Sequence, residues 1–335
     1  MSGVADTSGA SGAQSPRLSV AATRSLFRDR PMVPLLGLLA ILVIASELAS
    51  PGIVGPEWIG VMIRAAVPLA ILAGCQTLTM LTGGIDLSVG AVASMAGFLV
   101  ASLAASSGTP TGILIALVAA GLAGLVTGVG VGVFRVHPLI MTLGMSLVVL
   151  GLTNFYQLQT VTTSTGVPAE IRWIGSPTFA QILPYSLLVF VPVAAILLLG
   201  LRRTGYGRLL YAIGDNPIAA RLSGARSWQV LIVLYVISAL LAAVAGFLIS
   251  GVTNTASVSL ADSYVLPSVA AAVIGGTSIM GGRGGYSGTI IGALILTVVG
   301  SLLTSLGYPE AVRQVLFGAI IVAVAAAYTR VTGET

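Results

Sequence analysis

Asp86 is the ionisable residue with the most evident chemical setting in this largely apolar chain. It lies in the segment LTGGIDLSVG, residues 81–90, behind Gly83 and Gly84 and ahead of a long apolar stretch. As an N-cap, its carboxylate would accept hydrogen bonds from the first free amides of a following helix, at the positive end of the helix dipole. Alternatively, a broken helix exposes backbone and carboxylate to a water-filled path at membrane depth. The two interpretations are compatible with each other.

The composition sets the environment of this segment. Of the 335 residues, 56% are hydrophobic and 7% are charged, and the mean hydropathy is +1.04. One bilayer crossing needs about 20 apolar residues, and such stretches follow one another after Pro31. The sequence therefore predicts an all-α polytopic membrane protein. Its basic residues lie between apolar segments and not in a patch with interleaved aromatics, so we expect them to meet the membrane surface and not nucleic acid.

Hydropathy and helix breakers predict about ten transmembrane helices in one membrane domain over residues 32–330. The expected spans are 32–49, 60–81, 87–105, 111–134, 138–158, 184–201, 228–250, 264–280, 286–305 and 311–329. Residues 1–31 are rich in Ser, Gly and Ala, which predicts a disordered cytoplasmic tail.

The arginines predict the orientation, because the chain contains no lysine. If the N-terminus is cytoplasmic, 12 of the 15 arginines face the cytoplasm, and Arg64, Arg172 and Arg313 fall towards the other face. This agrees with the positive-inside rule. With an even number of spans, both termini are expected in the cytoplasm.

Two glycine-rich stretches form a weak internal repeat. TMLTGGIDLSVGAV at 79–92 and TSIMGGRGGYSGTI at 277–290 share Thr at the first position, Gly-Gly at the fifth and sixth, and Gly at the twelfth. Both are expected where an inward-running helix turns outward, so the repeat is parallel and suggests a path between two halves. Chance recurrence of glycine-rich turns in a chain with 42 glycines is the alternative.

Three smaller features favour structural roles. His137 has no cluster of Cys, Asp or Glu nearby, so we expect a helix-end residue and no metal site. Cys75, the single cysteine, is expected to pack within a span. A small residue recurs at every fourth position of the fourth span and predicts a close internal helix contact; these residues are Ala116, Ala120, Gly124, Gly128 and Gly132.

The longest internal cytoplasmic loop, 202–227, carries five arginines. Asn216 followed by Pro217 is typical of a helix start, with Asn as the cap and Pro at the first helical position. We expect a short helix that continues to Gly224, held by Ile218 and Leu222. The helix is either a docking surface for a partner or rests on lipid headgroups, and the residues leave that choice open.

Three stretches carry a resemblance to a known family. LTGGIDLSVGAV, AAAVIGGTSIMGGRGGYSGTIIGA and TGYGRLLYAIGDNPIAARLSGA resemble the permease subunits of bacterial ABC sugar importers of the ribose, xylose, arabinose and galactose type. The resemblance covers about residues 32–330. It implies an inner-membrane subunit that forms a homodimer or heterodimer, receives a monosaccharide from a periplasmic binding protein, and is driven by a cytoplasmic ATPase subunit.

The resemblance also assigns two groups of residues. The signature or translocation segment consists of Gly83, Gly84, Asp86, Ser88 and Gly90. The element that the ATPase subunit grips consists of Gly205, Gly207, Asn216, Ala219, Ala220 and Gly224. His137 departs from the apolar residue that commonly precedes Pro138 in the family.

The absence of lysine excludes one role for this chain. A Walker A loop needs a lysine to hold nucleotide phosphates, so ATP must be hydrolysed on another polypeptide and this chain is a transport subunit that binds no cofactor directly. A secondary transporter or channel for a small polar solute also fits the hydropathy. Ion coupling usually involves intramembrane carboxylates, however, and Asp86 is the one candidate near mid-chain. A membrane enzyme would need a nucleophile, base or metal constellation, and none converges in the sequence.

Overall fold

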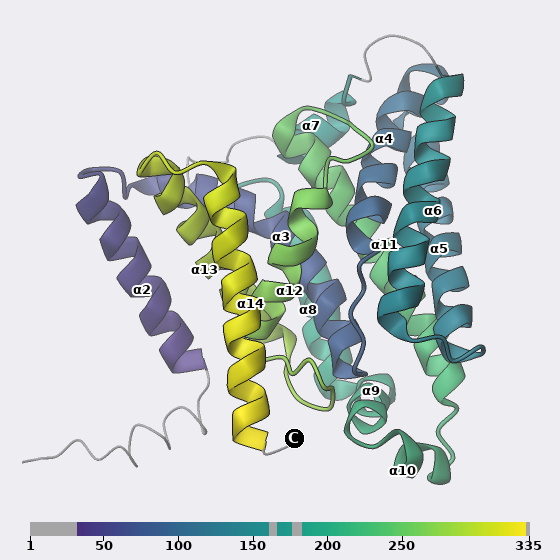
Figure 1. Cartoon of the computed structure of the whole chain (residues 1–335). Helices are drawn as coiled ribbons and strands as arrows, with labels where there is room; N and C mark the ends of the chain where they lie inside the picture. The colour runs from purple at the N-terminus through teal and green to yellow at the C-terminus, as the bar shows by residue number, and fades with distance from the viewer. Residues whose placement is uncertain (1–31, 161–165, 176–182, 333–335) are drawn as a thin grey trace, which may run out of the picture.

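The computed structural model describes residues 32–160, 166–175 and 183–332, with side chains as far as residue 323, and this part is built from helices (Figure 1). The tail predicted for 1–31 lies outside the described residues. The elements in chain order are α2 (Met32–Ala49), α3 (Pro56–Leu81), α4 (Val89–Ser107), α5 (Thr109–Gly132), α6 (Pro138–Gln159), α7 (Ala169–Gly175), α8 (Leu187–Arg203), α9 (Gly205–Asp215), α10 (Pro217–Leu222), α11 (Ser227–Thr253), the 3₁₀ turn η1 (Asp262–Tyr264), α12 (Val265–Ile274), α13 (Tyr286–Ser305) and α14 (Glu310–Thr332).

The helix lengths confirm a polytopic helical membrane protein. Within the described residues, 7 helices are long and apolar enough to cross a bilayer, and α8 with α9 would make an eighth span, bent by 67°. The 7 are α2, α3, α4, α5, α6, α11 and α13. The full span predicted over 264–280 is wrong, because α12 has 10 residues and ends where Gly276 adopts a φ of +88°. The predicted count of ten is therefore not confirmed.

Helix α11 lies at the centre of the larger half, packed against α3, α4, α5 and α7. Leu234 and Leu248 are fully buried on it, and Ala242 and Ala243 bring neighbouring backbones close. Its sequence is apolar on nearly every face, as expected for a helix surrounded by others. By contrast, α6 exposes Leu147 and Leu152, which suits a helix with one face against lipid.

The small-residue stripe of α5 confirms its predicted role as an internal helix contact. A Cβ on Gly124 would lie 2.5 Å from the Tyr235 carbonyl oxygen, and one on Gly128 would lie 2.6 Å from the Cα of Ile232. Ala116 is fully buried. Without side chains in the way, α5 and α11 approach to backbone contact, which is how small residues stabilise helix pairs in membranes.

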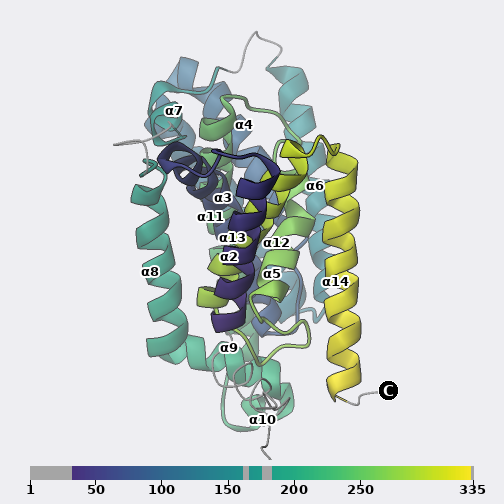
Figure 2. The ribbon, with the colours of Figure 1, turned by 90° about the vertical axis from the view of Figure 1, so that its left-hand side faces the viewer.

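The other half is formed by α12 and α13 against α3, with α2 packed on α13 and α14 on α12. Figure 2 shows α2 in front of α13, between α8 and α14 at the two edges. Buried hydroxyls join this half to α3: Thr77 and Thr289 share a hydrogen bond of 2.7 Å, and the Tyr286 hydroxyl donates to the Ala70 carbonyl oxygen at 3.0 Å. These bonds satisfy polar groups that would be costly to bury alone.

Helices α9 and α10 lie at one end of the molecule, and α7 lies at the other (Figure 1). The C-terminal end of α14 lies on the side of α9 and α10 (Figure 1). The start of α2 is on that side too, since Met32 and Tyr211 line one cavity.

Helix α9 was not among the predicted elements, which left 202–216 as loop. Gly207, Leu210 and Ile213 are its buried residues, and this spacing of three is the signal for a helix with one apolar face. Thr204 caps it, because its hydroxyl oxygen accepts from the Gly207 amide at 3.1 Å.

Candidate functional site

Three segments far apart in sequence meet through their backbones at the end of the molecule that carries α9. The Gly282 amide donates to the Leu81 carbonyl oxygen at 3.0 Å. A Cβ on Gly214 would fall inside the van der Waals shell of that same oxygen and 2.5 Å from the Gly282 nitrogen. We call this contact the glycine junction. It comprises Leu81 at the end of α3 with Gly83 just after it, Gly214 and Asp215 of α9, and Gly281 and Gly282 before α13.

Two of the junction glycines are required by both conformation and space. Gly281 has a φ of +95° and Gly282 a φ of +70°, a region that residues with a Cβ rarely adopt. A Cβ on Gly281 would lie 3.0 Å from the Gly83 nitrogen, and one on Gly282 would lie 2.9 Å from the Cα of Asp215. The three segments therefore touch at a distance that no side chain permits.

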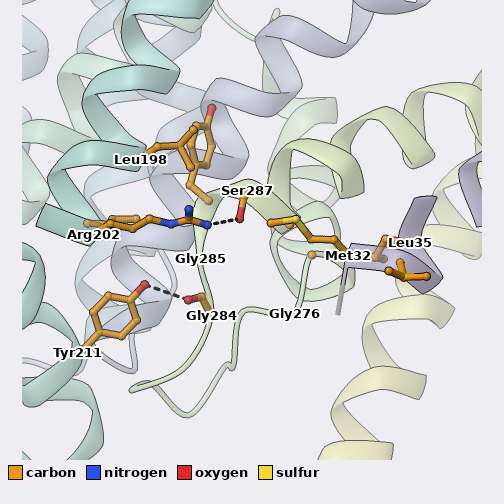
Figure 3. Close-up of a pocket in the computed structure, with 14 residues that line it drawn as sticks. Met32, Leu35, Leu198, Arg202, Tyr211, Gly276, Gly284, Gly285 and Ser287 are labelled. Carbon is orange, nitrogen blue, oxygen red and sulfur yellow. Dashed lines mark hydrogen bonds between the residues drawn. The ribbon is translucent and has the colours of Figure 1, made fainter. Parts of the chain in front are cut away.

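Side-chain hydrogen bonds reinforce the junction along a cavity of about 600 Å³ (Figure 3). The Tyr211 hydroxyl of α9 donates to the Gly284 carbonyl oxygen at 2.9 Å, and the Arg202 guanidinium of α8 donates to the Ser287 hydroxyl at 3.2 Å. In Figure 3, Met32 and Leu35 of α2 lie on the opposite side of this cavity. The bent pair α8–α9 is thus bonded to the turn before α13 and to the first residues of α13.

The Asp86 carboxylate lies next to the junction, in a buried polar cluster. Its Oδ1 accepts from the Ser88 amide at 3.0 Å and from the Ser88 hydroxyl at 2.6 Å, and its Oδ2 accepts from the Ser238 hydroxyl of α11 at 2.8 Å. Asp86 is 2% exposed. Donors on both carboxylate oxygens offset part of the cost of burying this side chain.

The turn that carries Asp86 is braced by two further side chains. The Gln76 amide group donates to the Asp86 carbonyl oxygen at 2.8 Å and accepts from the Asp86 amide at 3.2 Å. The Thr142 hydroxyl of α6 donates to the Ile85 carbonyl oxygen and accepts from the Leu87 amide, each at 3.1 Å. Helices α3, α6 and α11 all hold this irregular backbone, which is how non-helical chain is tolerated within a membrane protein.

The capping interpretation of Asp86 is right about the kind of bond and wrong about the position. Helix α4 begins at Val89 with Ser88 as its N-cap, so Asp86 lies two residues earlier and binds the Ser88 amide instead of the first amides of the helix. Because the carboxylate is buried, it does not contact an open path in this conformation. Its proposed role in translocation stays a prediction.

The other residues of the signature segment have packing roles. A Cβ on Gly84 would lie 3.1 Å from the Tyr235 hydroxyl, and one on Gly90 would lie 3.1 Å from the Ala261 carbonyl oxygen. Gly83 has a φ of +78°. The predicted set Gly83, Gly84, Asp86, Ser88 and Gly90 is therefore brought together, and its members contact α6, α11, the start of α12 with the residues just before it, and the turn before α13.

The two glycines predicted at the start of the coupling loop lie in the first turn of α9. Gly205 is exposed, and the nearest atom to a Cβ there is on the Arg208 side chain, at 3.7 Å. Gly207 is buried, and a Cβ there would lie 2.5 Å from the Gly200 carbonyl oxygen. Gly207 thus lets α9 fold back onto α8, whereas Gly205 has no such packing role.

Asn216 joins α9 to α10 as the predicted N-cap. Its Oδ1 accepts from the Ile218 and Ala219 amides, both at 3.0 Å, and this confirms the short helix that begins at Pro217. Gly224 follows α10 with a φ of +87°, and its Cβ position faces open space.

The orientation of α10 corrects one expectation. Ile218 and Leu222 were expected to hold the helix, with Ala219 and Ala220 towards a partner. Ile218 is 63% exposed and Leu222 is 84% exposed, whereas Ala220 is buried. Ala220 faces the body of the protein because its methyl group fits the close approach of α10 to the bundle, and the apolar surface offered outwards is that of Ile218 and Leu222.

Sequence reasoning missed the partners that complete the site. Gly281 and Gly282 were noticed in the repeat, and no signal linked them to Gly214. Ser238 lies in an apolar run of α11 without a motif around it. A serine in such a run is the available hint, since a buried hydroxyl needs a partner.

The apolar spans, the irregular turns packed within them and the helix pair set across one end define a polytopic membrane transport protein. Residues 59–325 match the family described as the permease component of branched-chain amino acid transport systems. The chain therefore belongs to this family of permease components.

Three of the proteins similar to this chain are named as permeases for sugars. The chain is 33% identical over 289 residues to the ribose import permease of Bacillus subtilis (strain 168), covering 86% of this chain and 89% of that protein. It is 32% identical to the fructose import permease of Rhizobium meliloti, over 76% of this chain and 72% of the relative. It is 31% identical to the galactofuranose transporter permease of Escherichia coli (strain K12), over 78% and 77% of the two chains. No solved structure matches this chain.

The Asp86 cluster predicts an unequal response to two substitutions. In Asp86→Asn, the amide oxygen can still accept from the Ser88 amide and hydroxyl, and the amide nitrogen can donate to the Ser238 hydroxyl oxygen. We therefore expect membrane levels and thermal stability in detergent close to those of the unmodified protein. Asp86→Leu leaves both hydroxyls buried and unpaired, at a cost of about 1–3 kcal/mol for each group.

Melting in detergent measures this difference, with Asn154→Leu on the exposed face of α6 as the control for adding a leucine. Equal stability losses for the Asn and Leu variants would contradict the hydrogen-bonding account, and would show that the charge of Asp86 is what matters.

Proposed function

We propose that this chain is the membrane permease subunit of an ATP-driven importer that carries a monosaccharide of the pentose or hexose class. The observation that carries the proposal is the similarity to the ribose import permease over 86% of this chain. Relatives named for fructose and galactofuranose support the same substrate class. Because the sequence contains no lysine for a Walker A loop, the ATP is hydrolysed on a partner ATPase subunit.

The orientation follows from charge and from the position of α9 and α10. Arg135, Arg221 and Arg226 line one cavity beside α10, and Arg202 and Arg203 end α8 immediately before α9. The positive-inside rule places this arginine-rich end in the cytoplasm. Both termini are then cytoplasmic, and the protein lies in the bacterial inner membrane.

Coupling to the ATPase subunit is proposed for α9, α10 and the residues next to α10. This region contains the predicted element Gly205, Gly207, Asn216, Ala219, Ala220 and Gly224. Ile218 and Leu222 offer an exposed apolar surface on α10, of the kind that marks a protein interface. If the ATPase subunit displaces α10, the displacement is passed to α9 through Asn216, which joins the two helices. Helix α9 in turn contacts Leu81 and Gly282 directly. The glycine junction would transmit movement of the coupling helices to the turns before α4 and α13 together.

The opposite end is the proposed docking face for a periplasmic binding protein. Helix α7 lies there, and the Trp173 and Tyr185 rings stack with centroids 4.7 Å apart. The Thr109 hydroxyl donates to the Glu170 carboxylate at 2.9 Å. Hydrogen bonds from the backbone amide of Glu170 and from the Thr109 hydroxyl hold the pKa of the Glu170 carboxyl below its usual value. Residues 161–165 and 176–182, on either side of α7, lie outside the described residues. A second permease copy completes the proposed importer.

Transport assays test the function directly. We expect vesicles that contain this chain, its ATPase subunit and its binding protein to accumulate labelled ribose or fructose when ATP is supplied, and labelled leucine to remain outside. Leucine is the control because the family description names branched-chain amino acids. Accumulation of leucine without sugar would contradict the substrate class, and sugar accumulation by the permease alone would contradict the dependence on a partner ATPase.

The exposed face of α10 predicts a variant that breaks docking and leaves folding intact. Leu222→Glu places a charge in the proposed interface, so we expect co-purification of the ATPase subunit to fall about tenfold or more. Stability in detergent should be unchanged, since Leu222 is 84% exposed. Tyr308→Glu, between α13 and α14, is the matched control at an exposed aromatic. Normal ATPase association by Leu222→Glu would show that α10 is not the docking surface.

A further inference from the structure

A cavity of about 710 Å³ beside α10 is lined by three arginines from three different elements. Arg135 follows α5, Arg221 belongs to α10 and Arg226 precedes α11. No Asp or Glu is among the described residues that line this cavity. Three cations around one hollow without a carboxylate are a setting that favours an anion.

Polar groups in the same cavity are arranged for an anion as well. The first residues of α11, a helix of 27 residues, line the cavity, and its N-cap Arg226 makes no side-chain capping bond. The Ser227 hydroxyl at this helix end is buried and has no hydrogen-bond partner among the described residues. A helix N-terminus adds positive potential and free amide donors to the guanidinium groups.

The arginines lack competing acidic partners. Within the described part of the chain, the one ion pair joins Arg313 and Glu310, far from this cavity in the sequence. Arg221 donates from Nε to the Pro217 carbonyl oxygen at 3.2 Å, which leaves its terminal nitrogens for another acceptor. Arg135 holds a φ of +55°, in the left-handed region that few residues other than glycine adopt.

Apolar residues decide between a free anion and a lipid. Val131, Ile213 and Leu231 line the cavity with the arginines. At its edge, Trp228 is 46% exposed, and Phe134, between two lining residues, is 75% exposed. A site with a basic pocket, an apolar wall and exposed aromatics at the end of two spanning helices fits the headgroup boundary of a bilayer. A soluble anion would make no favourable contact with the apolar residues of this surface, whereas the acyl chains of a lipid would.

We propose that this cavity binds an anionic phospholipid, with its phosphodiester between Arg135, Arg221 and Arg226 and its acyl chains along α5 and α11. Thr82 and Pro217 line the same cavity, so the bound headgroup lies between the signature segment and the start of α10. Its negative charge would reduce the repulsion among three like charges and hold α10 against α5 and α11. The orientation given above puts this cavity at the cytoplasmic leaflet of the membrane. Only this choice of leaflet rests on the proposed function.

Lipid binding can be measured on the permease alone. In detergent micelles, brominated phosphatidylglycerol quenches nearby tryptophan, and Trp58→Phe with Trp173→Phe leaves Trp228 as the single reporter. We expect saturable quenching by brominated phosphatidylglycerol, and quenching by brominated phosphatidylcholine about tenfold weaker or less.

Charge variants test the three arginines. Replacing Arg135, Arg221 and Arg226 with Gln should weaken phosphatidylglycerol binding about tenfold or more. The matched control replaces Arg203, Arg208 and Arg283 with Gln; these arginines are exposed and do not line the cavity, so the same loss of charge should leave binding unchanged. Lys at the three cavity positions should recover most of the affinity. If the triple variant fails to fold, the single variant Arg226→Gln replaces it in the test, and we expect it to lose less affinity for phosphatidylglycerol.

Four results would overturn the proposal. They are equal quenching by the two lipids, equal losses in the cavity and control variants, displacement of the lipid by millimolar inorganic phosphate, and displacement by the ATPase subunit. The third would assign the cavity to a free anion, and the fourth to an acidic segment of the partner. None of these results bears on sugar uptake, so the proposed function stands or fails separately.

Discussion

The backbone contact between Leu81, Gly214 and Gly282 is the constraint on which the rest of the structure depends. Main-chain atoms of three remote segments lie at distances that exclude a single Cβ, and one hydrogen bond of 3.0 Å joins two of them. Because interiors are close-packed and respond in discrete steps, we expect a movement of α9 to move both glycine-rich turns. A short helix at the edge of the bundle is thereby connected to the start of α4 and of α13.

The surroundings of the junction divide into a rigid part and a loosely packed part. The Asp86 turn is bonded to α3, α6 and α11, and α5 lies on α11 at backbone contact. Helix α2, by contrast, buries only Ser46 and rests on α13. A transport cycle needs parts that stay together and parts that separate, and the hydrogen bonds mark Asp86, Gln76 and Ser238 as parts that stay together.

The pattern of side chains in the sequence predicted most of the spans and helix ends. It could not predict the contacts between main-chain atoms. The span 32–49 coincides with α2. The prediction that His137 lies at a helix end is confirmed, because it immediately precedes α6 and its ring nitrogen accepts from the Leu139 amide at 3.3 Å. Hydropathy extended α12 too far because Ile279 and Met280 are apolar, although the chain from Gly275 to Met280 is not helical. Gly214 carries no side chain whose spacing could reveal a partner 68 residues further along, at Gly282.

The most direct test of the account replaces Gly214 with Ala. The added methyl group cannot fit beside the Leu81 carbonyl oxygen, and such overpacking costs about 1–3 kcal/mol. Gly200→Ala on α8 is the control, since nothing lies within 4 Å of its Cβ position. The measurement is the sugar imported per ATP hydrolysed by the reconstituted complex. We predict a fall of about tenfold for Gly214→Ala with the ATPase subunit still bound, and no change for Gly200→Ala. An unchanged ratio for Gly214→Ala would contradict coupling through the junction.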